Sequence, residues 1–423
     1  MSQTHPSQDT QPGRSLWRNR DFLLLWSGQS VSTLGTGIST FALPLLALAL
    51  THSPALAGSL AAVRQAPYLL FSLPAGALVD RWDRKRVMIF CDVGRWLALG
   101  SVPLAFALGH LTLAQLYVVG FAEGTAYVFF SLAQIAALPQ VVVPAHLSRA
   151  YALDNANEYV GALLGPALGA FLIGLAPAIE LGSMLAYLAD SVSYLFSVVS
   201  LRFMRVSFQK ERARACGGGR AAVSQRSLWA EIAEGLRFLW GQRRLRLMVL
   251  LTTIINFLQS PVTLAVIVLA GRELHLDVQT LGLVVSAGGV GGALGALMAP
   301  WLRGRLRFGQ IIIGSVLLWS AAALALMAAP SAVVLAVGSG LVSLLWPVYG
   351  VTLVSYRLEV TPDALQGRVN SAFRFLSYGS EPLGAALGGA LLTALGPRPV
   401  LGLIAGGLAL SGLVALGTEL RKG

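Results

Sequence analysis

Twelve long apolar stretches follow one another along this 423-residue chain, and no other feature restricts its fold as strongly. Charge, Pro and Gly separate them, and we expect their limits at about 22–50, 55–79, 87–109, 113–143, 150–175, 181–204, 245–271, 279–302, 309–329, 331–357, 367–395 and 397–417. A membrane-spanning α-helix needs roughly 20 apolar residues. A water-soluble chain of this length would need more surface charge than 12% of its residues can supply. The sequence therefore predicts an all-α integral membrane protein with twelve transmembrane helices.

One long polar segment separates the sixth stretch from the seventh. It contains the basic run KERARACGGGRAAVSQR and then SLWAEIAEGLRFLW, which places four apolar side chains on one helix face: Leu228, Ile232, Leu236 and Leu239. We expect the second run to form an amphipathic helix on the membrane surface. The predicted domains are a disordered cytoplasmic tail (1–20), a six-helix bundle (21–204), a cytoplasmic linker with the amphipathic helix (205–244), a second six-helix bundle (245–417) and a tail (418–423).

Most of the 31 Lys and Arg residues fall in segments that would share one side of the membrane. Because basic loops remain in the cytoplasm, we expect a multi-pass protein of the cytoplasmic (inner) membrane with both termini in the cytoplasm. The net charge of +12 then reflects topology and attraction to anionic membrane lipid. Nucleic acid is not an expected partner, because no aromatic-basic module accompanies the charge.

The two halves of the chain resemble each other. A shift of 219 residues lays RAYALDNANEYVGALLGPALGA (149–170) over RVNSAFRFLSYGSEPLGAALGG (368–389), so that Gly165 meets Gly384. A duplicated six-helix unit explains this similarity and predicts two pseudo-symmetric bundles.

The stretch GALVDRWDRKRV, residues 76–87, concentrates six charges in twelve residues. It resembles the loop between helices 2 and 3 of the major facilitator superfamily, G-x-x-x-D-R-x-G-R-[KR]-[KR]. The matching residues are Gly76, Asp80, Arg81, Arg84, Lys85 and Arg86, whereas Asp83 stands where the family has a second Gly. The N-terminal run NRDFLLLWSGQSVSTLGTGISTFALPLL is similar to the drug:proton antiporter branch, which includes macrolide efflux pumps and enterobactin exporters. The resemblance covers nearly the whole chain and implies the major facilitator fold.

This resemblance implies that the 76–87 stretch is a conformational latch. Gly76 would let helix 2 approach a neighbour closely, and Asp80 would face the N-terminus of helix 11 and hold the outward-open state together on the cytoplasmic side. The alternative for the basic residues is a membrane anchor. Asp92 and Arg95, three residues apart, are expected to form a structural ion pair beside the latch.

Helix 5 carries GALLGPALG, which resembles the antiporter signature G-x-x-x-G-P-x-x-G-G. The matching residues are Gly161, Gly165, Pro166 and Gly169, with Ala170 in place of the last Gly. Small residues four apart let two helices touch backbone to backbone, and Pro bends a helix. Ordinary helix packing is the alternative interpretation of this motif.

Charged residues inside membrane helices are costly and therefore indicate function. Proton coupling needs an acid, and the candidates are Glu123, Glu158, Asp190 and Glu381. Arg64 and Glu123 are expected at matching depths in helices 2 and 4 and therefore as a charge pair. Arg374 and Glu381 are seven residues apart, which would place them on one face of helix 11, where they could pair or share a water.

The sequence favours a secondary active exporter of amphipathic or hydrophobic small molecules, drug-like or macrolide-like, which exchanges substrate for protons by alternating access. We expect a monomer that is not an enzyme. No cofactor is expected, because the chain lacks the P-loop motif G-x-x-x-x-G-K-[ST] that binds ATP, and no metal is expected, because its two cysteines lack metal-ligand spacing. A siderophore exporter, a lysophospholipid flippase and a transport-inactive receptor of the same fold are the alternatives. Candidates for the substrate cavity, with helix packing as the alternative for each, are Gln29, Phe41, Tyr127, Asn256, Gln259, Trp346 and Tyr349.

Overall fold

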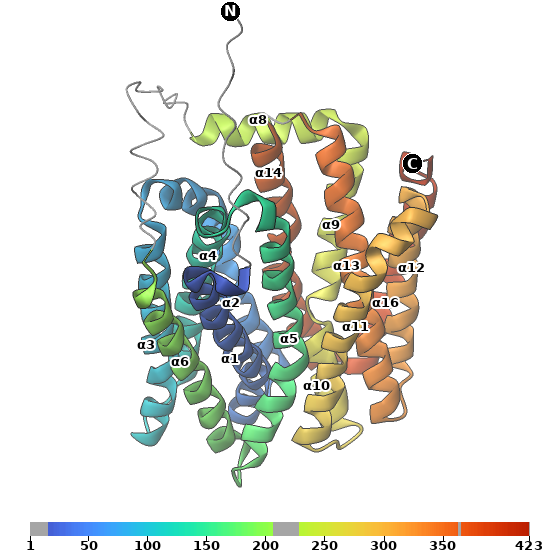
Figure 1. Ribbon diagram of the computed structural model, residues 1–423. Helices are drawn as coiled ribbons and strands as arrows, with labels where there is room; N and C mark the ends of the chain where they lie inside the picture. Colours follow the sequence, from blue (N-terminus) through green and yellow to red (C-terminus); the bar gives the residue numbers. More distant parts are fainter. Residues whose placement is uncertain (1–15, 206–227, 363–364, 423) are drawn as a thin grey trace, which may run out of the picture.

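The computed structural model describes residues 16–205, 228–362 and 365–422 as helices joined by short turns, without a strand in these ranges (Figure 1). The helices before the first gap are α1 (Arg20–Thr51), α2 (Pro54–Arg81), α3 (Arg84–Ala107), α4 (Leu113–Val141), α5 (Leu147–Gly174) and α6 (Ile179–Phe203). Those after it are α8 (Leu228–Gly241), α9 (Arg243–Gln259), α10 (Val262–Arg272), α11 (Val278–Arg305), α12 (Phe308–Met327), α13 (Ala332–Val360), α14 (Gln366–Tyr378), α15 (Glu381–Leu395) and α16 (Pro397–Leu416).

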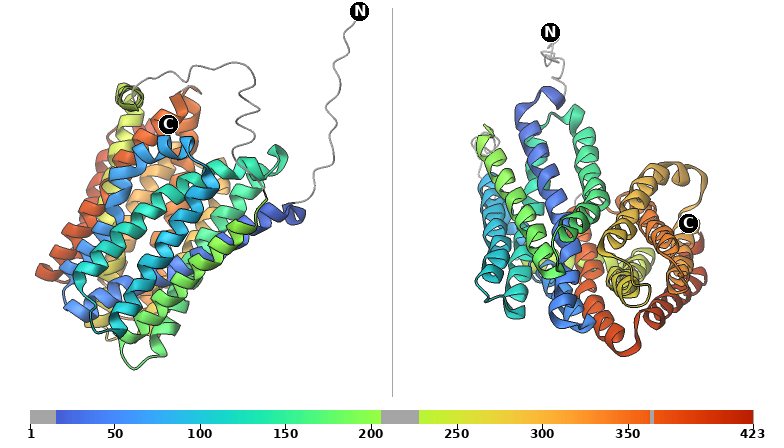
Figure 2. Two further views of the ribbon diagram at one scale, coloured as in Figure 1. Left: turned by 90° about the vertical axis from the view of Figure 1, so that its left-hand side faces the viewer. Right: turned by 90° about the horizontal axis from the view of Figure 1, so that it is seen from below.

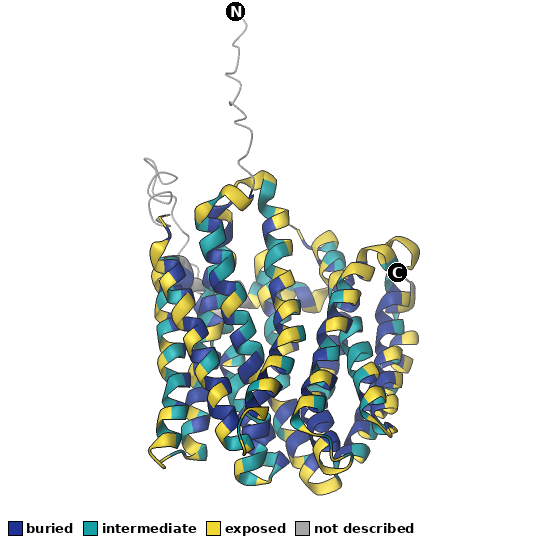
Figure 3. Cartoon of the chain, turned by 60° about the horizontal axis from the view of Figure 1, so that its bottom comes forward, coloured by how far each residue is buried: buried dark blue, intermediate teal, exposed yellow. Residues whose placement is uncertain are grey.

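These helices confirm the predicted all-α membrane fold. In the described ranges, 10 helical segments are long and apolar enough to cross a membrane, with α9 and α10 counted as one segment. The helix α2 and the pair α14–α15 occupy the two remaining predicted spans. Exposed positions run along the outward faces of the helices (Figure 3). Apolar side chains are among the exposed ones, such as Phe90, Leu297 and Val333, which are 71% to 80% exposed. Such a surface suits contact with lipid.

The C-terminal end of the described chain and α8 lie at one end of the molecule, which we call the tail side (Figure 1). The opposite end is the far side. Viewed from the far side, the helices of residues 20–203 and those of residues 243–416 form two groups that lie side by side (Figure 2, right).

The predicted amphipathic helix corresponds to α8, which runs across the tail side (Figure 1). It packs on α14, because Arg368 Nη1 donates a hydrogen bond of 2.6 Å to Glu234 and Leu239 is fully buried. The side chains of Leu228 and Ile232 lie outside the described residues. The helix therefore belongs to the second group of helices, in addition to having a surface face.

Two predicted spans are interrupted near their middle. The span 245–271 is divided between α9 and α10, and the span 367–395 between α14 and α15. Pro261 and Pro382 each stand at or next to the start of the second piece, where a missing N–H costs least. The sequence analysis predicted one continuous helix in both places and was wrong there.

The two interruptions lie against each other and share hydrogen bonds. Ser260 Oγ donates to the carbonyl oxygen of Glu381, and Ser380 Oγ donates to that of Thr253, both at 2.9 Å. Asn256 Nδ2 also donates to a carbonyl oxygen of α14, at 2.9 Å. Backbone groups at membrane depth must be satisfied within the protein, and side chains across the two breaks perform this task.

Glycines of α5 set its distance from α1. A Cβ on Gly165 would lie 2.5 Å from the Cα of Gly37, and a Cβ on Gly161 would lie 2.7 Å from a methyl carbon of Thr33. Gly169 is similarly close to α1, at Ile38. The α5 motif therefore packs α5 backbone to backbone against α1.

The two groups of helices touch at the far side. A Cβ on Gly58 of α2 would lie 2.7 Å from the Cα of Gly389 of α15. The Ala55 N–H donates a hydrogen bond of 2.9 Å to Thr393 Oγ1. At the tail-side end of α2, no atom of another helix in the described part of the chain lies within 4 Å of a Cβ placed on Gly76. The close approach at Gly76 therefore stays a prediction.

Candidate functional site

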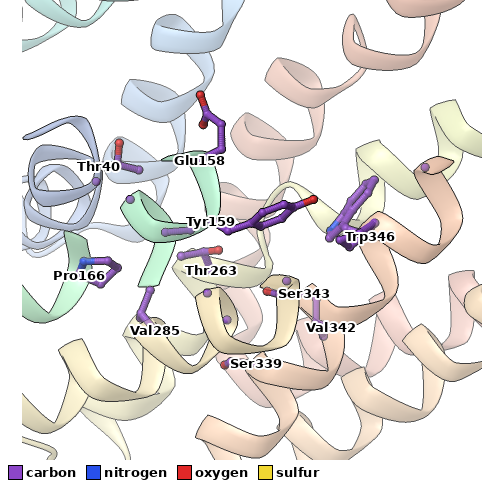
Figure 4. A pocket seen from close by; sticks show the side chains of 18 of the residues that line it. Thr40, Glu158, Tyr159, Pro166, Thr263, Val285, Ser339, Val342, Ser343 and Trp346 are labelled. Carbon is purple, nitrogen blue, oxygen red and sulfur yellow. The ribbon is translucent and has the colours of Figure 1, made fainter. Parts of the chain in front are cut away.

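A cavity of about 970 Å³ lies between the two groups of helices. The helices α1 and α5 line it from one side, and α10, α11 and α13 line it from the other (Figure 4). Most of its wall is apolar or carries small hydroxyl groups, and the labelled side chains include Thr40, Tyr159, Ser343 and Trp346. Glu158 is the one charged residue in this wall as described. The cavity can accept a large, mainly apolar organic molecule.

A second cavity, of about 570 Å³, adjoins the first and shares Glu158 and Tyr378 with it. Its wall is much richer in charge, and the charged residues are Arg64, Glu123, Glu158, Arg374 and Glu381. They come from α2, α4 and α5 on one side and from α14 and α15 on the other. This second cavity therefore brings together three of the four acids that the sequence analysis selected.

Glu123 on α4 is held by two arginines. Arg64 Nε lies 2.5 Å from its Oε2, and Arg95 Nη2 lies 3.2 Å from its Oε1. The Glu123 side chain is only 5% exposed, so its charge is compensated inside the protein and not by solvent. The structure brings Arg64 and Glu123 together as the sequence analysis expected, and it adds Arg95.

Asp92 and Arg95 form the ion pair that the sequence analysis expected. Both residues are buried in the middle of α3, where Arg95 Nη1 is 3.8 Å from Asp92 Oδ1 and the Arg95 guanidinium carbon is 4.5 Å from the centre of the Tyr194 ring. Ser197 Oγ donates a hydrogen bond of 2.7 Å to Asp92. The expected ion pair is long, and the closer partner of Arg95 is Glu123, because one side of α3 faces α4 and α6.

The remaining acids occupy different surroundings. Asp190 on α6 is fully buried, lies 3.2 Å from Ser193 Oγ and lines neither cavity. Glu158 on α5 is exposed in the cavity walls. Glu381 is the first residue of α15 and lines the second cavity.

Arg374 and Glu381 do not form an ion pair in the described part of the chain. The break between α14 and α15 removes the common helix face that a seven-residue spacing would give. Arg374 instead lies over two tyrosine rings, with its guanidinium carbon 5.7 Å from the ring centre of Tyr68 and 5.8 Å from that of Tyr378.

The basic residues of the 76–87 stretch bind the tail-side ends of neighbouring helices. Arg84 Nη1 donates a hydrogen bond of 2.6 Å to the carbonyl oxygen of Ala136 in α4. Lys85 Nζ donates a hydrogen bond of 2.7 Å to the carbonyl oxygen of Met204, which follows α6. Asp83 caps α3 by accepting a hydrogen bond of 3.0 Å from the Arg86 N–H. The side chains of Asp80 and Arg81 lie outside the described residues, so the latch stays a prediction.

Three of the seven predicted cavity residues line a cavity, namely Phe41, Tyr127 and Trp346. The other four are absent from both walls: Gln29, Asn256, Gln259 and Tyr349. Three of these four bond to nearby helices instead, as Tyr349 Oη does with Thr252 Oγ1 at 2.7 Å. The sequence analysis missed Tyr68 and Tyr159, and also a row of threonines at a three- to four-residue spacing in α1: Thr33, Thr36 and Thr40. Because residues at this spacing share one helix face, the sequence could have indicated that these threonines line a common surface.

The family model of the Major Facilitator Superfamily matches residues 25–380. The chain therefore belongs to this superfamily of membrane transporters, as its resemblance to the family predicted. It is similar to the Multidrug efflux pump Tap of Mycobacterium tuberculosis H37Rv, with 27% identity over 416 residues, 94% of this chain and 93% of the relative. It is also similar to Macrolide efflux protein A of Streptococcus pyogenes, with 24% identity over 243 residues, 57% of this chain and 56% of the relative.

Solved transporter structures share the fold. The nucleoside transporter NupG (D323A mutant) has a TM-score of 0.75 at 14% identity and covers 95% of this chain and 99% of its own. A bacterial homologue of the iron transporter ferroportin, in an inward-facing state, has a TM-score of 0.72 at 16% identity and covers 96% of this chain and 99% of its own. These similarities, together with the efflux relatives, indicate a transporter rather than an enzyme.

Proposed function

We propose that this transporter is a secondary active exporter of amphipathic or hydrophobic small molecules, driven by proton antiport. The observation that carries the proposal is the large, mainly apolar cavity between the two groups of helices, which adjoins a smaller cavity containing the paired Glu123. An apolar cavity with few polar groups suits amphipathic organic compounds. The efflux proteins to which the chain is similar support the same direction of transport.

The proposed orientation places the tail side in the cytoplasm of a cell with this protein in its cytoplasmic membrane. The basic residues of the tail side support it, because Lys and Arg collect in cytoplasmic loops. Contacts such as that between Gly58 and Gly389 would then close the outer side, and the structure would represent an inward-facing state. The bundles 21–204 and 245–417 would move against each other during alternating access, and the latch would form when the cytoplasmic side closes.

Glu123 is the proposed proton carrier of the first half. Its carboxylate compensates Arg64 and Arg95 at the same time. A proton on Glu123 would leave two arginines with one weaker anionic partner, Asp92, so the cluster would have to rearrange. Such a cluster can connect protonation to a change between two packing arrangements.

Transport into inside-out membrane vesicles tests the proposal. An imposed gradient with acid inside the vesicle should drive a radiolabelled macrolide into the vesicle against its own gradient, and a protonophore should abolish this accumulation. Vesicles without the protein serve as the control. Accumulation that persists after the proton gradient has collapsed, or that follows sodium, would contradict proton coupling.

A further inference from the structure

Three charged side chains in the wall of the second cavity have no ion-pair partner in the described part of the chain. They are Glu158, Arg374 and Glu381, whereas Arg64 and Glu123 in the same wall are paired. Charged groups at membrane depth normally pair with one another or face a water-filled path. A basic and an acidic group that face the same cavity but do not pair are available to a ligand.

Arg374 is held beside two tyrosines, which engage only part of its guanidinium group. Its guanidinium group lies over Tyr68 of α2 and Tyr378 of its own helix, and these two rings pack edge to face with their centres 5.5 Å apart. Ring contacts attract the flat face of a guanidinium group. A guanidinium group has five N–H donors, and those that do not bind the Tyr68 hydroxyl are suited to a carboxylate or a similar planar anion.

Glu158 lies at the junction of the two cavities, on the opposite group of helices from Arg374. It belongs to the walls of both cavities, and Figure 4 shows its carboxylate extending from α5 to a different side than the ring of the adjacent Tyr159. A ligand whose apolar part fills the larger cavity would therefore pass Glu158. A protonated amine is the chemical group that a carboxylate in such a wall recognises best.

We propose that the preferred substrates of this transporter are zwitterionic amphiphiles, with a basic amine bound by Glu158 and an acidic group bound by Arg374. The inference rests on the proposed export function and adds the substrate class. A neutral compound would leave Glu158 and Arg374 without a partner, and a singly charged compound would leave one of these two without a partner. A zwitterion pairs with both and connects the two groups of helices.

Binding to purified protein in lipid nanodiscs tests the substrate class without any gradient. The probes share a biphenyl body: one carries an aminomethyl group at one end and a carboxylate at the other, and two others carry a methyl group in place of either charge. The two-charge probe should bind about tenfold more tightly than either one-charge probe, since each charged hydrogen bond adds affinity.

Two substitutions assign the charges. Arg374→Gln should reduce affinity for the two-charge probe to that of the amine-only probe and leave the amine-only probe unaffected. Glu158→Gln should reduce the affinity for the two-charge probe to that of the carboxylate-only probe and leave the affinity for the carboxylate-only probe unchanged. Arg305→Gln is the matched control, because Arg305 also lies over an aromatic ring, 4.4 Å from the centre of Trp301, but lines neither cavity.

The inference would be overturned if the three probes bound with equal affinity. It would also be overturned if Arg374→Gln lowered the affinity for all three probes by the same factor. Vesicle transport of the same probes separates it from the proposed function. Gradient-driven transport of the amine-only probe with no preference for the two-charge probe would refute the substrate class and leave export standing. Charge-dependent binding without gradient-driven transport of any probe would refute export and retain the binding site.

Discussion

Arg95 Nη2 lies 3.2 Å from Oε1 of Glu123, and this contact joins the middle of α3 to the middle of α4. Arg64 binds the other oxygen of the same carboxylate from α2. Three helices of the first half are therefore tied together by one acidic side chain. A change in the charge of Glu123 therefore weakens the contacts that hold all three helices together.

Glu123→Gln is expected to abolish the pH dependence of transport. The amide keeps the size of the side chain, so the protein should still insert and fold, but it cannot carry a proton. The measurement is gradient-driven accumulation in vesicles across a range of pH. Glu180→Gln, at the far-side start of α6, is the control. A wild-type pH profile in Glu123→Gln would assign the proton to Glu158, Asp190 or Glu381.

Arg95→Ala should destabilise the protein more than Arg64→Ala. The Arg95 side chain is 4% exposed and that of Arg64 is 22% exposed, so less water replaces the lost charge at Arg95. Breaking a fully buried pair costs about 3–5 kcal/mol. Thermal unfolding of both variants in detergent measures the difference, and the reverse order would show that Arg64 is the principal partner of Glu123.

Adding Glu123→Ala to Arg64→Ala should fail to restore stability. Removing both partners of a simple pair would eliminate the unpaired charge, but here Arg95 would lose its closest carboxylate and retain only Asp92, at 3.8 Å. The double variant should therefore unfold at a lower temperature than Arg64→Ala alone. Recovery of the wild-type unfolding temperature would mean that Arg95 is satisfied without Glu123.

Gly165→Ala is expected to lower stability by about 1–3 kcal/mol, because the new methyl group overlaps the backbone of Gly37 and forces α5 away from α1. Gly314→Ala is the matched control, since no described atom outside its own turn of α12 lies within 4 Å of a Cβ placed there. It should be neutral, or stabilising by up to about 1 kcal/mol. Equal effects of the two substitutions on thermal unfolding would contradict the proposed packing role.

The N-cap of α11 should contribute stability that depends on pH. A hydrogen bond from the Thr280 hydroxyl, with help from backbone N–H groups, lowers the pKa of Asp277. The stabilisation should be fully present above the ordinary Asp pKa of about 3.9 and disappear as the pH falls through the lowered value. Asp277→Ala should therefore unfold at a lower temperature than wild type at pH 7, by about 1 kcal/mol, with a smaller difference in strong acid. A difference that grows in acid would contradict this assignment.

Asp80→Asn tests the latch. If Asp80 stabilises the state with a closed cytoplasmic side, its neutral analogue should shift the population towards the state described here. A cysteine at position 76, in a variant lacking Cys91 and Cys216, reports the change because no other helix among the described residues lies within 4 Å of a Cβ at that position. Faster labelling from the tail side is expected. Unchanged labelling together with unchanged transport would leave Asp80 with a topological role alone.

Hydropathy predicted the spans well because the bilayer imposes both helical structure and length. The ends of α1 and α13, for example, lie within about three residues of their expected positions. The breaks after Gln259 and Tyr378 were missed, because hydropathy responds to apolar side chains and not to carbonyl groups satisfied by Ser260 and Ser380.

The candidate site was predictable only in part. Arg64 and Glu123 could be matched by depth, since both lie at a similar distance from the ends of their helices. Arg95 could not be assigned to Glu123, because depth alone does not give the direction in which a side chain leaves its helix. The same limitation explains why Tyr349 was expected in the cavity but is buried against Thr252.

The contact between Gly58 and Gly389 has a consequence for how the range of transported compounds can evolve. Here the backbones of α2 and α15 are in direct contact without side chains between them, so this contact cannot adjust by a change of side-chain rotamer. A larger side chain at either glycine would force the two groups of helices apart at the far side, and small solutes could then leak through the protein. Variants with an altered compound range should therefore accumulate in the walls of the larger cavity, on α1 and α13, while these two positions stay glycine.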